Sequence, residues 1–175
     1  MKAESSSKLL LWGGAGVVLI ADQLSKLWVI QNLKPYVPSD VFPWLSPVLS
    51  FTRLTNTGVA FGLFPQLGDF FTILAALVVL AIILFHRTLE AGDWPIHLAL
   101  GLQIGGALGN LVDRIFRGSV VDFIDVNFWP LQHWPVFNLA DAFIVVGVFL
   151  LLIVTWCEEE QERPEAPPEE APADV

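Results

Sequence analysis

Four long apolar segments, separated by polar connections, dominate the pattern of the sequence. They cover about residues 9–30, 68–86, 96–115 and 136–156. A helix needs about 20 predominantly apolar residues to cross the roughly 30 Å hydrocarbon core of a bilayer, and each segment is close to that length. The pattern therefore predicts an all-α membrane protein with four transmembrane helices.

The first segment has a second interpretation, because Lys2 and Lys8 precede its apolar run as they would in a secretory signal peptide. Cleavage after Ala21 would place Leu19 where a small residue is normally found. Further apolar segments also follow it along the chain. We therefore expect a first helix that is retained in the protein.

The third segment carries glycines at a regular spacing. Gly101, Gly105 and Gly109 recur every four residues, which places them on one face of a helix. A stripe of this kind lets a neighbouring backbone approach closely in a membrane bundle. The spacing predicts close helix packing and carries no chemistry of its own.

The two connections at 34–66 and 117–135 predict a small β-structure on the membrane surface. The first contains several prolines followed by the β-prone run 48–55, and the second contains a similar run at 120–126. Strand edges need partners, so we expect the two runs to pair with each other.

The composition supports a membrane protein and excludes several other classes. Hydrophobic residues make up 54% of the chain and charged residues 15%, against about 45–50% and about 25% in soluble domains. The net charge of −9 is concentrated in residues 158–175, which hold eight acidic residues and one arginine. We expect this Glu- and Pro-rich tail to be disordered. The body has no basic face for nucleic acid, and the single cysteine excludes an internal disulfide.

The polar residues in and around the apolar segments gather at one side of the predicted membrane. Successive helices alternate in direction, so the end of the first, the start of the second, the end of the third and the start of the fourth lie together. The polar residues near these positions are Asp22, Lys26, Asn56, Asn110, Asp113, Arg114, Asp122, Asn138 and Asp141. A charge at the bilayer centre costs about 2.5–3.5 kcal/mol, so these side chains are expected to face inward and to pair.

Four of the charged residues favour a structural interpretation. Asp22 and Lys26 are four residues apart and can meet on one helix face. Asp113 and Arg114 form a second candidate pair that would neutralise itself. We expect these four residues to hold the bundle together or to position a substrate.

The remaining polar residues are three amides, Asn56, Asn110 and Asn138, and two carboxylates, Asp122 and Asp141. Asn110 and Asn138 are expected to make interhelical hydrogen bonds. Asp122 and Asp141 have no obvious cation beside them in the sequence, and Arg117 is a candidate partner for either. These two aspartates are therefore the candidates for a chemical role.

Two carboxylates without dedicated cations indicate aspartic-protease chemistry. Like charges a few ångströms apart do not both ionise easily, so such a pair holds one proton between its members. The ionised member can take a proton from water as a general base, while the protonated member polarises the scissile carbonyl. The pair titrates as a unit, so the sequence leaves open which aspartate has which role.

Three other functions remain as alternatives. Asp113, Asp122 and Asp125 could hold Mg²⁺, as in enzymes that act on lipid head groups. A proton-coupled carrier could use the charges of the first and fourth segments, although the sequence has no detectable inverted repeat. A non-enzymatic membrane scaffold would need neither candidate aspartate beyond folding.

Five motifs occur in order along the chain. They are Asp22-Gln-Leu-Ser-Lys26, Asn56-Thr-Gly-Val-Ala-Phe-Gly62, Gly105-Gly-Ala-Leu-Gly-Asn-Leu-Val-Asp-Arg114, Val120-Val-Asp-Phe-Ile-Asp125 and Phe137-Asn-Leu-Ala-Asp-Ala142. Together they closely resemble the bacterial lipoprotein signal peptidases, also called signal peptidase II. The resemblance covers roughly residues 8–156.

The resemblance implies a membrane aspartic endopeptidase that removes signal peptides from prolipoproteins and cuts just before a cysteine carrying diacylglycerol. It implies a bacterial inner-membrane protein with both termini cytoplasmic and the active site near the periplasmic face. Basic residues are equally numerous on both sides of the predicted bundle, so the orientation rests on the resemblance. Lipid-modified prolipoproteins and membrane lipids are the expected partners of a monomeric protein that uses no metal or other cofactor.

The resemblance also implies roles for individual residues. The family's catalytic aspartates correspond to Asp122 and Asp141. The residues expected to bind substrate or to support the site are Asp22, Lys26, Asn56, Gly106, Asn110, Asp113, Arg114 and Asn138. The segment at 34–66 corresponds to a small extracytoplasmic β-cradle. Residues 1–157 are expected to form the peptidase domain, whereas the tail at 158–175 lies outside the family pattern and is expected to be dispensable for cleavage.

Overall fold

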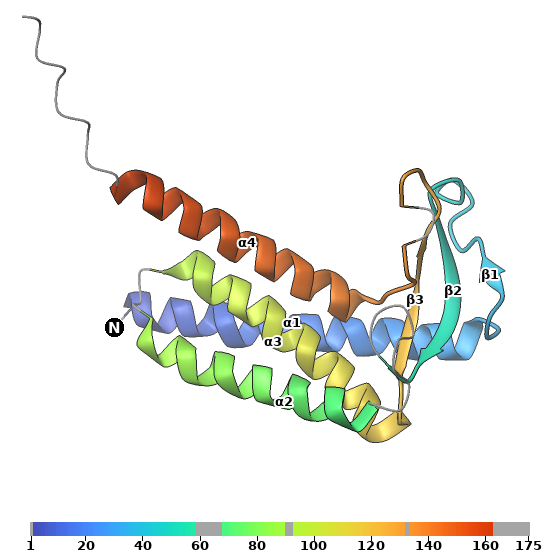
Figure 1. The fold of residues 1–175 in the computed structure, drawn as a ribbon, viewed down its shortest axis with the longest axis horizontal. Helices are drawn as coiled ribbons and strands as arrows, with labels where there is room; N and C mark the ends of the chain where they lie inside the picture. The colour runs from blue at the N-terminus through green and yellow to red at the C-terminus, as the bar shows by residue number, and fades with distance from the viewer. Residues whose placement is uncertain (1, 59–67, 90–92, 132–133, 163–175) are drawn as a thin grey trace, which may run out of the picture.

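Four long helices lie side by side in the computed structural model, with a small sheet at one end (Figure 1). The structure describes residues 2–58, 68–89, 93–131 and 134–162. The helices are α1 (Lys2–Asn32), α2 (Gly68–Phe85), α3 (Trp94–Arg117) and α4 (Leu139–Glu162), and a short 3₁₀ helix, η3 (His86–Thr88), follows α2. The strands are β1 (Pro38–Ser39), β2 (Leu49–Asn56) and β3 (Val120–Val126).

The predicted apolar segments all form helices, but they differ in length and hydropathy. Among the described residues, three helices are long and apolar enough to cross a membrane: Ser7–Asn32, Trp94–Arg117 and Leu139–Glu158. The apolar stretch Thr72–Thr88, which includes most of α2, is shorter. The structure thus confirms a mostly helical membrane protein with three helices of full spanning length.

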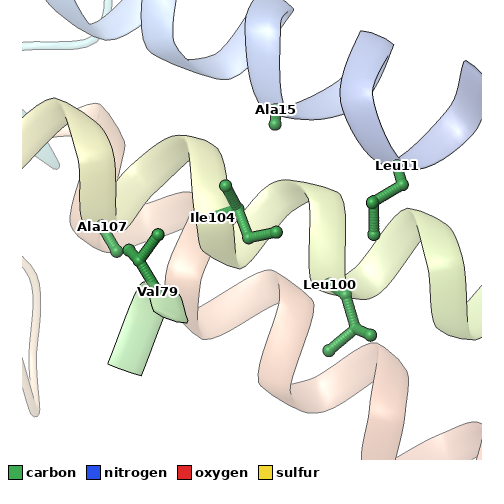
Figure 2. Packing of buried hydrophobic residues seen from close by; sticks show 6 residues of the cluster. All are labelled: Leu11, Ala15, Val79, Leu100, Ile104 and Ala107. Atoms are coloured by element: carbon green, nitrogen blue, oxygen red, sulfur yellow. The ribbon is translucent and has the colours of Figure 1, made fainter. Parts of the chain in front are cut away.

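Helix α3 lies at the centre of the bundle, where its glycines allow close contact with α1. A Cβ atom added at Gly101 would lie 2.5 Å from the carbonyl oxygen of Leu11, and one added at Gly105 would lie 2.6 Å from that of Ala15. No side chain fits at either position, which confirms the packing predicted from the glycine spacing. Residues from α1, α2 and α3 form the apolar core next to these contacts (Figure 2): Leu11, Ala15, Val79, Leu100, Ile104 and Ala107.

The sheet has the strand order β1-β2-β3, with antiparallel neighbours. β2 and β3 are the two predicted β-prone runs, and their pairing confirms that prediction. The segment before α4 extends the pairing, because the main-chain N–H groups of Phe123 and Ile124 donate to the carbonyl oxygen of Phe137 at 2.9 and 2.7 Å. This connection holds the start of α4 beside β3.

The sheet is attached to the C-terminal end of α1. Val29 of α1 packs in one buried cluster with Val121, Phe123 and Ile124 of β3. The guanidinium of Arg53 on β2 donates to the carbonyl oxygen of Ile30 at 2.9 Å. The last carbonyl groups of a helix have no partner within it, so this contact satisfies one of them while it fixes the sheet on the bundle.

The start of the C-terminal tail differs from its prediction. Helix α4 continues to Glu162, so residues 158–162, which were predicted to belong to a disordered tail, are helical. Glutamate is a good helix former, and here it extends a helix that the apolar residues before it have already nucleated. The rest of the predicted tail, residues 163–175, lies outside the described residues.

Candidate active site

Asp122 and Asp141 line one cavity between the sheet and the start of α4. Its volume is about 770 Å³, and Asn56, Asn110 and Arg114 line it as well. Asp122 lies on β3 and Asp141 in the first turn of α4. The two candidate catalytic residues, 19 positions apart in the sequence, therefore face a common space in the folded chain.

A reciprocal cap fixes Asp141 at the start of α4. The main-chain N–H of Asp141 donates to Oδ1 of Asn138 at 3.0 Å, and the main-chain N–H of Asn138 donates to Oδ2 of Asp141 at 3.2 Å. This is the capping-box arrangement, in which the residue before the helix and the third helical residue each satisfy the other's N–H. The side chain of Asp141 is thus held by the same local sequence that begins the helix.

Asp122 accepts a hydrogen bond at each of its carboxylate oxygens. Nδ2 of Asn138 donates to Oδ1 at 2.6 Å, and Nδ2 of Asn56 donates to Oδ2 at 2.8 Å. Asn56 is itself held at the end of β2, because its Oδ1 accepts the main-chain N–H of Gly58 at 3.0 Å. Asn138 therefore contacts both aspartates, Asp122 through its side chain and Asp141 through its main chain.

Asn110 connects α3 to this pair. Its Nδ2 donates to Oδ1 of Asp141 at 2.7 Å, and its Oδ1 accepts from Nδ2 of Asn138 at 3.2 Å. These contacts between α3 and the start of α4 confirm the prediction that Asn110 and Asn138 make hydrogen bonds between helices. The same Oδ1 also accepts from the ammonium of Lys26 at 2.9 Å, so the network reaches α1.

Burial makes Asp122 a carboxylic acid that titrates near neutral pH. Asp122 is 3% exposed. Desolvation, followed by the negative charge of Asp141, raises the pKa of Asp122 to about 6, against the hydrogen bonds from Asn56 and Asn138, which favour the charged form. A proton shared between the two aspartates is consistent with this environment.

A buried group of charges lies beside the candidate pair. The ammonium of Lys26 is 2.9 Å from Oδ2 of Asp22 and 2.9 Å from Oδ2 of Asp113, and all three side chains are 0% exposed. The contact between Asp22 and Lys26 confirms the predicted pair. Gln23, which the sequence did not single out, donates to both carboxylates, at 3.1 Å to Asp22 and 3.2 Å to Asp113. Gln23 lies inside the motif Asp22-Gln-Leu-Ser-Lys26, and this position is the feature of the sequence that could have indicated its role.

Two predicted charge pairings are wrong. Asp113 pairs with Lys26 and with Arg117 rather than with Arg114. Neighbouring residues of a helix point in different directions, whereas residues four apart share a face, so Arg117 reaches Asp113. Arg117 consequently serves neither Asp122 nor Asp141. Arg114 instead lines the cavity and interacts electrostatically with both candidate aspartates.

Gly106 lies at the contact between α3 and α4. A Cβ atom added there would be 2.4 Å from the carbonyl oxygen of Ala140 and 2.8 Å from Cγ1 of Ile144. The absence of a side chain lets the two helices meet immediately before Asp141. Gly106 therefore acts on the site through packing.

Comparison with known proteins identifies the family. The model of the family described as Signal peptidase (SPase) II matches residues 15–157. The chain belongs to the signal peptidase II family. The matched region contains both candidate aspartates and all the residues that were expected to support them.

Relatives and solved structures resemble this signal peptidase II family member over most of its length. A lipoprotein signal peptidase of Syntrophomonas wolfei is 40% identical over 153 residues, which cover 87% of this chain and 96% of the relative. One of Cyanothece sp. is 39% identical over 169 residues, which cover 90% and 92%. A solved bacterial membrane enzyme is 29% identical with a TM-score of 0.78, covering 93% of this chain and 94% of its own. The fold described above is therefore similar to that of an experimentally solved membrane enzyme.

The metal-site alternative is not favoured for this signal peptidase II chain. Asp125, one of the three carboxylates it requires, accepts from the hydroxyl of Thr52 on the sheet at 2.9 Å. A second, Asp113, is neutralised by Lys26. Within the part of the chain that the structure describes, no three His, Cys, Asp or Glu side chains are grouped so that they could hold a metal ion.

Proposed function

We propose that the protein cuts the signal peptide from lipid-modified prolipoproteins in the bacterial membrane, with Asp122 and Asp141 as its catalytic pair. The observation that carries this proposal is the arrangement of the two carboxylates. They line one cavity of about 770 Å³ and are both bonded to Asn138. Membership of the signal peptidase II family supports aspartic-peptidase chemistry at such a pair.

The reaction needs one proton shared by the two aspartates. The ionised carboxylate removes a proton from a water molecule as the water oxygen bonds to the scissile carbonyl carbon, and the protonated carboxyl group donates its proton to the carbonyl oxygen. Collapse of the tetrahedral intermediate breaks the C–N bond: the amine leaves with the proton of the carboxyl group that took it from water, and one hydroxyl proton of the intermediate returns to the other carboxylate, which restores the singly protonated pair. Asn56 and Asn110 each donate to one carboxylate oxygen, which keeps the two acids oriented.

The cavity suits a substrate that carries acyl chains. Most of its lining is apolar and comes from the segment between β3 and α4 and from the first turns of α4, including Trp134, Ile144 and Val145. Apolar lining with a few convergent polar groups is typical of small-molecule binding sites, and an apolar lining suits acyl chains. Arg114 contributes a positive charge to the cavity. These features support a diacylglyceryl-modified cysteine next to the scissile bond, with the modified protein and surrounding lipids as the partners.

We further infer that four helices cross the inner membrane, with both termini in the cytoplasm and the site near the periplasmic face. The end of α1, the start of α2, the end of α3 and the start of α4 all lie at the sheet end of the bundle (Figure 1). Exported precursors present their cleavage sites outside the cytoplasm, which favours this orientation. We expect a monomer that needs no metal ion.

Cleavage of a diacylglyceryl prolipoprotein by the purified protein tests this function. Asp122→Asn and Asp141→Asn should each lower turnover by 10²-fold or more, because positioned acid–base groups contribute about 10²–10⁴-fold. Asp125→Asn is the matched control, since Asp125 lies on the same strand but bonds to Thr52, and it should keep near-normal turnover. A chelator should have no effect.

Three outcomes would point elsewhere. Turnover that survives in Asp122→Asn or Asp141→Asn would refute the aspartic mechanism. Loss of activity with a chelator, together with an active Asp141→Asn variant, would favour the metal-dependent lipid enzyme. No cleavage by the wild-type protein in a membrane-like environment would leave a non-enzymatic scaffold as the better interpretation.

A further inference from the structure

Each carboxylate that binds Lys26 also binds the main chain beside a candidate catalytic aspartate. Oδ1 of Asp22 accepts the N–H of Ala140 at 3.0 Å, and Ala140 immediately precedes Asp141. Oδ2 of Asp113 accepts the N–H of Val121 at 3.1 Å, and Val121 immediately precedes Asp122. The same contact thus occurs twice, from α1 to the start of α4 and from α3 to β3.

Neither N–H is bonded within its own regular element. Ala140 is the second residue of α4, where an N–H has no partner inside the helix. The N–H of Val121 is directed at α3 rather than along a ladder of strand hydrogen bonds. The two main-chain segments are therefore held by side chains from other elements, at the residue next to each aspartate.

Lys26 joins the carboxylates of Asp22 and Asp113 to each other. Its ammonium has three N–H bonds and three acceptors, Oδ2 of Asp22, Oδ2 of Asp113 and Oδ1 of Asn110, each at 2.9 Å. Asn110 in turn donates to Asp141 at 2.7 Å. A single buried ammonium thus fixes both carboxylates and orients the amide that contacts Asp141.

Stability alone does not account for this arrangement. Buried ion pairs can often be replaced by well-packed apolar residues of similar volume without loss of stability. The three side chains are 0% exposed, and none of them is among the described residues that line the cavity. They act on the site through the main chain and through Asn110, because none of them can contact a substrate in the cavity directly.

We propose that Asp22, Lys26 and Asp113 form a positioning clamp, in which two carboxylates joined by one ammonium set the separation between the chain segments that carry Asp122 and Asp141. This inference rests on the proposed function, because it takes those aspartates as the catalytic pair. Asp22, Lys26 and Asp113 are thereby assigned as positioning residues, distinct from the residues that contact substrate.

The two carboxylates differ in a way that gives a specific test. Asp22 uses one oxygen for Ala140 and the other for Lys26, so an asparagine, with its one oxygen, must lose one contact. Asp113 uses Oδ2 for both Val121 and Lys26, so an asparagine can keep both and loses only its contacts at Oδ1. Asp22→Asn should therefore lower kcat about 10²-fold, as expected for a displacement near 1 Å, whereas Asp113→Asn should lower it less than tenfold.

The test uses the full-length protein with a diacylglyceryl prolipoprotein. KM should change less than threefold in both variants, because neither residue lines the cavity. Arg117→Gln is the matched control, since Arg117 contacts Asp113 at Oδ1, away from the oxygen that holds Val121, and its kcat should remain near the wild-type value. Thermal unfolding of each variant reports its stability separately from its turnover.

Equal losses of kcat in Asp22→Asn and Asp113→Asn would overturn the clamp. Both variants remove one negative charge beside Lys26, so an equal loss would follow from that charge and not from the main-chain contacts. A loss confined to KM, or a loss that only follows the fraction folded, would overturn it as well. If Asp22→Asn does not accumulate, Asp113→Ala against Asp113→Asn gives the same comparison, since only alanine removes the contact with Val121. Active Asp22→Asn with inactive Asp122→Asn would refute the clamp alone, whereas active Asp122→Asn would refute the proposed function.

Discussion

Replacing Gly106 by alanine would test how strongly the site depends on the packing of α3 against α4. The added Cβ atom would lie 2.4 Å from the carbonyl oxygen of Ala140, whereas ordinary contacts of a Cβ atom begin near 3.4 Å. The oxygen belongs to the main chain, so it cannot rotate away. The start of α4 must therefore move by roughly 1 Å, together with Asp141 in the same turn.

The size of the effect follows from this displacement. The hydrogen bond of 2.7 Å between Asn110 and Asp141 crosses the same helix contact and would be stretched or broken. A misplacement of about 1 Å at a catalytic group can lower turnover by about 10²-fold, which corresponds to about 2.7 kcal/mol of activation free energy. Overpacking should also lower the free energy of unfolding by about 1–3 kcal/mol, partly offset by the better helix propensity of alanine.

Gly16→Ala is the matched control on α1. A Cβ atom added at Gly16 meets nothing within 4 Å, so this substitution gains helix propensity without a clash. It should leave turnover unchanged and should raise the free energy of unfolding by about 0.5–1 kcal/mol at most. Both variants would be compared by kcat on a diacylglyceryl prolipoprotein and by thermal unfolding in the same detergent. Turnover of Gly106→Ala within a factor of three of the wild-type value would refute the link between this contact and the site.

Further predictions concern pH, the cap of α4 and the tail. The pKa of Asp122 is raised from 3.8 to about 6, so its contribution to stability is complete below about pH 4 and is lost as the pH rises through 6. Thermal unfolding of Asp122→Asn should lack this part of the pH dependence. A pH profile unchanged from that of the wild type would contradict the pKa shift. Asn138→Ser should keep a good helix cap, and with it the thermal stability. The variant should lose turnover, because serine has no Nδ2 to donate to Asp122. Equal turnover in the wild type and the serine variant would contradict the role of Asn138 in orienting Asp122. Removal of residues 163–175 should leave kcat and KM unchanged, and a loss of cleavage would show that the tail takes part in activity.

The main elements of this protein could be predicted from its amino-acid sequence. Long apolar runs form helices because a membrane requires every main-chain polar group to be bonded within its own segment. The β-prone runs at 48–55 and 120–126 became paired strands because strand edges need partners. The alternation of helix directions also placed the polar residues at one end of the bundle, and the pair Asp22 and Lys26 followed from helical spacing alone.

The partner of each buried polar group depends on how the helices pack in the folded protein. Asp113 could have paired with its neighbour Arg114, but the rotation of α3 in the bundle directs it at Lys26, 87 positions away in the sequence. Gln23 and the main-chain contact between Asp22 and Ala140 depend in the same way on how α1, α3 and α4 cross. Local patterns fix the face on which a side chain lies, whereas its partner depends on the distance and rotation between helices. Those are set by the packing of the whole bundle, including contacts as close as that at Gly106.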